Sequence, residues 1–121
     1  MELASFIKHQ VYKLWLNGGV ERRLENRCQI AVPVSIQPVD PQFNAVGAPF
    51  SAVTRDISPQ GIGFVHAEHV DHTLLAIQMS LADKEANLVV RVRWCKELDP
   101  LYLYGASFVA RLESFPVCSV S

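Results

Sequence analysis

The sequence of 121 residues has few cysteines, no long apolar run and no excess of charge of one sign. Its three cysteines, Cys28, Cys95 and Cys118, lie far apart, and no pair has the CxxC spacing of a zinc site or a dithiol redox centre. No apolar run approaches the roughly 18 residues of a membrane-spanning helix, so we expect no membrane insertion. With 11 Lys and Arg against 12 Asp and Glu, the chain is not basic enough for a general DNA or RNA binder.

The sequence does contain enough apolar residues for a core. Half of the residues (50%) are hydrophobic and 19% are charged, which excludes an intrinsically disordered chain. The length fits one domain. The scattered cysteines indicate free thiols, which favour a reducing compartment, and the charges of Lys8 and Lys13 interrupt what could otherwise be a secretory signal. We therefore expect a cytoplasmic protein.

Residues 1–20 predict an amphipathic helix that ends at two glycines. Apolar side chains recur there at spacings of three and four, at Leu3, Phe6, Ile7, Val11, Leu14 and Trp15. Gly18 and Gly19 provide the stop, because glycine tolerates the left-handed conformation that follows a helix. The helix either packs on its own domain or contacts a partner, which makes a protein effector and a homodimer both candidates.

From Cys28 onward the hydrophobic period changes from 3.6 to 2, which is typical of half-buried strands. Turn-rich segments divide this part into six expected strands, at residues 28–37, 50–56, 62–66, 73–81, 88–95 and 101–111. Pro33 indicates an edge or a bulge in the first strand. Short turns without helices imply antiparallel pairing, and six strands in a small domain usually close. The expected fold is mainly β, a six-stranded antiparallel barrel with the N-terminal helix attached.

Strict alternation in the fifth strand separates two sets of side chains. It assigns Trp94 to the same face as the apolar residues Leu88, Val90 and Val92. Arg91 and Arg93 then share the other face, where we expect them to be exposed. A role for these two arginines in lining a ligand site is an alternative.

Three arginines gather between the predicted helix and the first strand, at Arg22, Arg23 and Arg27. A guanidinium group is a planar fork that pairs bidentately with phosphate and can stack on an aromatic base. In a flexible linker these forks could wrap around a ligand. The alternative is a solvated charged turn that caps the barrel.

A second group of candidate residues lies at the end of the second strand, in the segment Asp56-Ile57-Ser58-Pro59-Gln60-Gly61. An ionised carboxylate only accepts hydrogen bonds, which suits the N–H donors on the edge of guanine. A hydroxyl both donates and accepts, and a glycine lets a flat ligand come close. The alternative is ordinary turn chemistry, to which an Asp, a Ser and a Gly at this spacing are also suited.

One strand, a loop and another strand separate the two motifs, so they can be neighbours on the rim of a barrel. The order of RxxxR (Arg23 to Arg27), the strand CQIAVPVSI, DxSxxG followed by GIGFV, and the late segments NLVVRVRW and LYGASF resembles the PilZ domain family. The resemblance spans roughly residues 21–113, which we expect to form the barrel domain between the helix at 1–20 and a tail at 114–121.

The resemblance implies a split-barrel type of fold that binds the bacterial second messenger cyclic di-GMP, with no cofactor and no catalysis. It implies that Arg23 and Arg27 hold phosphates and stack on guanine, with Arg22 extending the motif toward a second, stacked ligand. The turn residues that contact a guanine base are then Asp56, Ser58 and Gly61. Gly105 matches a glycine of the last strand that serves packing. Family members often end in a helix, which this sequence lacks room for, so the N-terminal helix is expected to cover that end.

Two other functions are weighed against this one. The segment HAEHVDH offers His66, His69 and His72 as metal ligands, but their spacing in a loop favours a solvated polar segment, and no metal is expected. No HExxH motif or nucleophile elbow is present, so no enzyme is expected. Within the same family, a protein-interaction module that does not bind the nucleotide is the alternative, although the intact motifs favour binding.

Overall fold

The computed structural model describes residues 21–22, 28–81 and 84–117. The helix predicted over residues 1–20 lies outside these ranges, and so do Arg23, Arg27 and the end of the predicted tail. The described strands are β1 (Glu21–Arg22), β2 (Cys28–Gln29), β3 (Pro33–Pro38), β4 (Phe50–Ile57), β5 (Gly61–His66), β6 (Leu74–Leu81), β7 (Lys84–Glu97) and β8 (Tyr102–Leu112).

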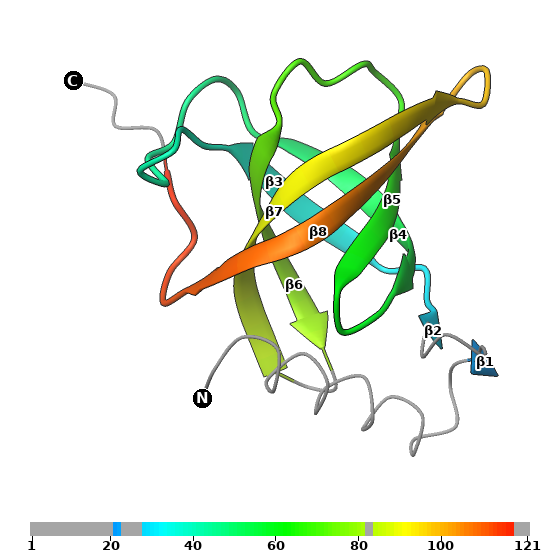
Figure 1. The fold of residues 1–121 in the computed structure, drawn as a ribbon, viewed down its shortest axis with the longest axis horizontal. Coiled ribbons are helices and arrows are strands. Elements are labelled where there is room, and N and C mark those ends of the chain that lie inside the picture. The colour runs from blue at the N-terminus through cyan, green and yellow to red at the C-terminus, as the bar shows by residue number, and fades with distance from the viewer. Residues whose placement is uncertain (1–20, 23–27, 82–83, 118–121) are drawn as a thin grey trace.

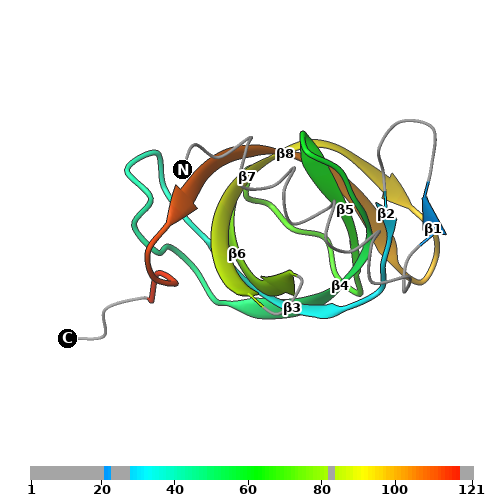
Figure 2. The ribbon, with the colours of Figure 1, turned by 90° about the horizontal axis from the view of Figure 1, so that it is seen from below.

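Six of these strands close into an antiparallel barrel. They follow one another in the order β4, β3, β6, β7, β8 and β5, and β5 pairs back onto β4. Figure 2 shows the closed ring from one end. The short strand β2 pairs with the last residues of β4, and β1 pairs with β2. The predicted mainly β fold with a six-stranded closed barrel is therefore confirmed (Figure 1).

The strand predicted over residues 28–37 is interrupted between β2 and β3. Pro33 is the first residue of β3, where it pairs with Val53 of β4, and β6 joins only from Ser35 onward. A proline has no N–H to donate, so this position is one that it tolerates. The Thr54 hydroxyl bridges the break, because it accepts a hydrogen bond from the Val32 N–H and donates one to the Ile30 carbonyl.

The connection between β6 and β7 is tighter than predicted. Lys84 and Glu85 lie between the strands predicted at residues 73–81 and 88–95, but they belong to β7 and pair with Leu81 and Ser80. Pairing continues from there to Leu74↔Arg91 without a register shift. The longer strand forms because nothing in this hairpin breaks the alternation of the ladder.

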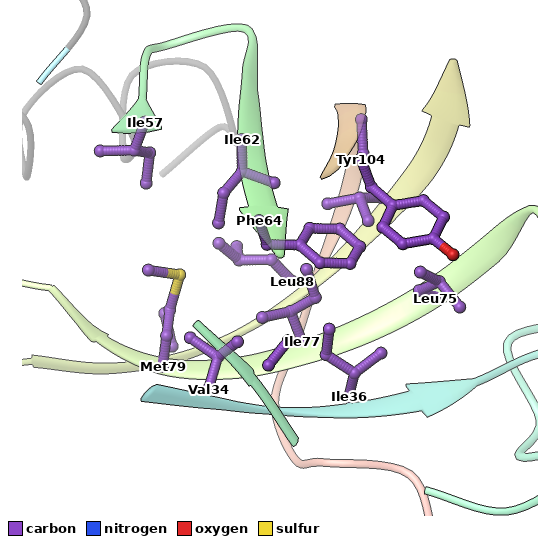
Figure 3. Close-up of a cluster of buried hydrophobic side chains, with 14 residues drawn as sticks. Val34, Ile36, Ile57, Ile62, Phe64, Leu75, Ile77, Met79, Leu88 and Tyr104 are labelled. Carbon is purple, nitrogen blue, oxygen red and sulfur yellow. The ribbon is translucent and has the colours of Figure 1, made fainter. Parts of the chain in front are cut away.

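The barrel encloses a core of alternating side chains from all six strands (Figure 3). The labelled members are Val34, Ile36, Ile57, Ile62, Phe64, Leu75, Ile77, Met79, Leu88 and Tyr104. Burying one such large apolar side chain contributes about 1.5–3 kcal/mol. The Tyr104 hydroxyl leaves the core at one end, where it accepts a 2.8 Å hydrogen bond from the Val70 N–H and donates to the Glu68 carbonyl. Burial raises the pKa of Tyr104 to about 12.

A second apolar cluster lies apart from that core, built on Val39, Leu74, Ala76 and Val89. The loop residue Phe43 packs against it, and so does Phe115 from the segment that follows β8. In the described part of the chain, this segment contributes an aromatic side chain to the second cluster and forms no helix. None of the described elements is a helix long and apolar enough to cross a membrane.

Candidate functional site

The turn between β4 and β5 is held by its own serine. The Ser58 N–H donates to the Gly61 carbonyl at 2.9 Å, and the Ser58 Oγ accepts from the N–H groups of Gln60 (3.3 Å) and Gly61 (3.2 Å). Ser58 is buried, with 2% of its surface exposed. A short polar side chain that bonds nearby backbone in this way fixes a turn. In this structure the Ser58 hydroxyl therefore shapes the rim.

Gly61 is required by packing between strands. A Cβ at this position would overlap the carbonyl oxygen of Ala106 on β8, because β5 and β8 pair closely there. A larger residue would have to push the two backbones apart. Gly61 thus sets the position of β8 beneath the site.

A β-bulge in β4 presents Arg55 and Asp56 on the same face. The β4–β5 register shifts between Thr54 and Asp56, which leaves Arg55 as the extra residue. Consecutive strand residues normally point to opposite faces, and a bulge removes that alternation. Asp56 is buried at 3% exposure, and its Oδ2 lies 3.1 Å from a terminal nitrogen of Arg55. The half-exposed guanidinium is therefore one of the partners of this buried carboxylate.

A second bulge, in β7, places Trp94 on the surface. The β7–β8 register shifts between Val92 and Trp94, so Arg93 is the extra residue and Trp94 pairs with Gly105. The indole lies on Gly105, where a Cβ would overlap the ring, and Trp94 remains 48% exposed. The assignment of Trp94 to the core face was wrong, because the bulge shifts the alternation by one residue. Gly105 has the packing role that the sequence indicated.

The two bulges face each other across a pair of glycines. Asp56 pairs with Gly63, Gly63 with Gly105, and Gly105 with Trp94, in one row across β4, β5, β8 and β7. The Asp56 Oδ1 occupies the space where Gly63 lacks a Cβ, just as the indole does at Gly105. Paired Cα atoms in an antiparallel sheet are about 4.5–5.5 Å apart. The carboxylate and the indole therefore lie over neighbouring residues.

This row lies in a surface hollow of about 430 Å³. Its walls include Arg55, Asp56, Arg93 and Trp94, and its floor is made largely of small residues of β5 and β8. Small-molecule sites commonly have volumes of 300–1,000 Å³. The hollow thus offers a hydrogen-bond acceptor, an aromatic surface and two cations within the space of a planar ligand.

The backbone also brings the ends of the arginine linker to this rim. Cys28 directly follows Arg27 and pairs with Ile57, while Gln29 pairs with Asp56. Arg22 directly precedes Arg23 and pairs with Cys28. The residues that flank the linker, Arg22 and Cys28, are therefore paired next to the Asp56 turn, and the motif arginines themselves lie outside the described ranges.

Arg55, Trp94 and Ser107 line the hollow but were not identified as site residues from the sequence. Arg55 carried no motif, and Trp94 was assigned to the interior. Periodicity does not reveal a bulge, but the glycines at 63 and 105 were a usable signal, because a glycine inside a strand marks a bulge or a close approach.

The three histidines at the end of β5 and in the loop after it have separate neighbours. His66 packs on Phe50 with ring centroids 4.4 Å apart, His69 lies 3.1 Å from an Asp71 oxygen, and His72 lies beside Gly47. Across the described ranges, no three side chains of His, Cys, Asp or Glu are grouped as metal ligands.

Comparisons with known proteins give one family. The sequence model of the PilZ domain matches residues 21–114, which is more than half of the chain and includes every described strand. A search of curated proteins finds no match.

Proposed function

The chain belongs to the PilZ domain family, a family of binding domains that generally recognise cyclic di-GMP, and from this we propose that it is a non-catalytic receptor for that nucleotide. The ligand bridges the linker at residues 22–27 and the barrel rim at residues 56–61. Its two chemical parts, guanine bases and phosphates, match the two parts of the site.

The observation that supports this proposal most strongly is the row of Asp56, Gly63, Gly105 and Trp94. The carboxylate of Asp56 suits the N–H donors of a guanine edge. The exposed indole beside it offers a surface on which a base can stack. Gly63 and Gly105 have no side chains of their own, and this leaves the room that lets Asp56 and Trp94 lie together at the hollow.

The linker supplies the positive charge. Arg23 and Arg27 pair with the phosphates, and Arg22 extends this contact toward a second, stacked ligand. Cys28 and Gln29 are fixed beside β4, so Arg27 is tethered within one residue of the rim. Ser58 and Gly61 serve mainly by holding the rim in place, since the Ser58 hydroxyl is already bonded within its turn.

Binding orders the linker and changes the direction of the preceding residues 1–20, which then engage or release a protein effector or a second copy of the chain. The ligand drives this change because it contacts one linker state better than the other. We place this receptor in the cytoplasm, a reducing compartment compatible with the exposed free thiol of Cys95.

Isothermal titration with cyclic di-GMP tests the proposal. Removing either motif arginine leaves phosphate charge unpaired, so Arg27→Ala weakens binding by about 2–5 kcal/mol. Arg111→Ala is the matched control, because Arg111 is an exposed barrel arginine near the end of β8 that does not line the hollow. Equal affinities of Arg27→Ala and Arg111→Ala would refute the assigned site.

A protein-interaction module that does not bind the nucleotide is the second candidate, since the family fold alone does not require a ligand. Thermal melting separates the two functions. A ligand present at 100 times its dissociation constant stabilises the folded state by about 2.7 kcal/mol, whereas the interaction module would show no shift.

A further inference from the structure

Arg93 differs from the other arginine of the hollow in its partner. The Arg55 guanidinium lies against the Asp56 carboxylate, whereas the Arg93 Nε–H donates a 2.7 Å hydrogen bond to the Ser107 Oγ on β8. Both Arg93 and Ser107 line the hollow, and Ser107 is half-buried. A neutral hydroxyl thus holds a charged side chain that the β7 bulge has placed on the surface.

The charge of Arg93 is uncompensated within the hollow. Among the described residues that line it, Asp56 is the one acid, and Arg55 already pairs with it. A guanidinium has five N–H donors, and Ser107 occupies one of them. In the described part of the chain, the other donors of Arg93 form no hydrogen bond and no ion pair, so they are available to an anion at the hollow.

We propose that Ser107 is a positioning residue that holds Arg93 over the hollow as a barrel-borne contact for an anionic group of the ligand. The inference rests on the proposed function, in which that group is a phosphate of cyclic di-GMP. Fixing the Nε–H leaves the two terminal amino groups as a fork, the geometry that pairs with a phosphate. A side chain already held in place loses less conformational freedom when it binds.

A double-mutant cycle measured by titration with cyclic di-GMP tests this role. Arg93→Ala weakens binding roughly 10-fold or more and makes the affinity less sensitive to salt, because one phosphate contact is lost. Ser107→Ala weakens binding roughly 3- to 10-fold, and it has no further effect in the Arg93→Ala background. Ser107→Thr keeps the hydroxyl and therefore retains wild-type affinity, which a purely structural role of the hydrogen bond would not require.

The control is Ser35→Ala, an exposed strand serine that lies outside the hollow. A melting temperature for Ser107→Ala close to that of the wild type establishes that the barrel is intact. If the wild type binds while Ser107→Ala matches it, or if the loss from Ser107→Ala persists undiminished without Arg93, the positioning role is overturned and the receptor function stands. If the wild type does not bind, the receptor function is refuted and the role of Ser107 with it.

Discussion

The two halves of β7 differ in their pairing partners and in their burial. From Lys84 to Arg91 the strand pairs with β6 in unbroken register, and Leu88 and Val90 are fully buried. Its pairing with β8 shifts once in this half, between Val89 and Val90. From Trp94 to Glu97, beyond the bulge at Arg93, the strand pairs with β8 alone, and every residue is exposed. In Figure 1 this second half runs with β8 toward the turn at residues 98–101.

This contrast shows how one small barrel separates stability from binding. Regular alternation fills the interior, while the bulge turns Arg93 and Trp94 together onto the surface. The same device operates at Arg55 and Asp56 on the opposite side of the hollow. Core residues should therefore affect unfolding, and residues of the bulges should affect the ligand.

The largest effect is expected in the regular half of β7. Leu88→Ala removes a fully buried side chain and leaves a cavity, which costs about 2–5 kcal/mol of unfolding free energy. Urea denaturation followed by circular dichroism measures this cost. A loss below about 1 kcal/mol would mean that the regular half does not carry the core.

Trp94→Ala should show the opposite pattern. Losing a stacking surface weakens cyclic di-GMP binding by about 1–3 kcal/mol, and the unfolding free energy changes by less than about 1 kcal/mol because the side chain is half exposed. Titration of this variant measures the loss of binding, and urea denaturation measures its change in unfolding free energy. Trp94→Phe is the control, because it keeps an aromatic ring. A large loss of stability with unchanged affinity would mean that the second half of β7 serves folding and not ligand binding.

Tyr104→Phe probes the core where β8 passes behind the hollow. The ring stays stacked on Phe64, at a centroid distance of 5.1 Å. The Val70 N–H loses its acceptor, which lowers the unfolding free energy by about 1–2 kcal/mol. Because burial raises the pKa of Tyr104 to about 12, the unfolded chain ionises first as the pH rises above about 10. The wild type should thus exceed Tyr104→Phe in unfolding free energy by the full amount below pH 10, and this difference should fall between about pH 10 and 12. A pH-independent difference in denaturation midpoint would contradict this.

The smallest effect is expected at Arg55. Its side chain is 51% exposed, so Arg55→Gln should change the unfolding free energy by no more than about 1 kcal/mol, and less at high salt. Denaturation at low and high salt measures the difference. A larger, salt-independent loss would mean that Arg55 contributes to the packing of the bulge and not only to its charge.

The fold could be predicted from the sequence because it depends on local signals. Period-2 alternation and turn residues gave the six strands, and Pro33 marked the interrupted one. The length of β7 was underestimated, since Lys84 and Glu85 resemble turn residues and their pairing with β6 depends on a neighbour.

The site could be predicted only in part. Asp56, Ser58 and Gly61 stood out as a motif, and the backbone beside them fits the predicted rim. Trp94 and Arg55 could not be placed, because a bulge arises from pairing between strands that are distant in sequence. Arg23 and Arg27 stay predictions, because they lie outside the described residues, although their neighbours Arg22 and Cys28 pair with each other.

The central claim is that the arginine linker and the hollow form one binding site. Adding cyclic di-GMP to the isotope-labelled protein and following the backbone and indole N–H signals by NMR tests this directly. We expect the signals of Asp56, Gly63, Gly105 and Trp94 to shift together with those of residues 22–27, while those of β6 stay in place. Unchanged signals across that row at saturating ligand, or shifts confined to β6 and the second apolar cluster, would contradict it.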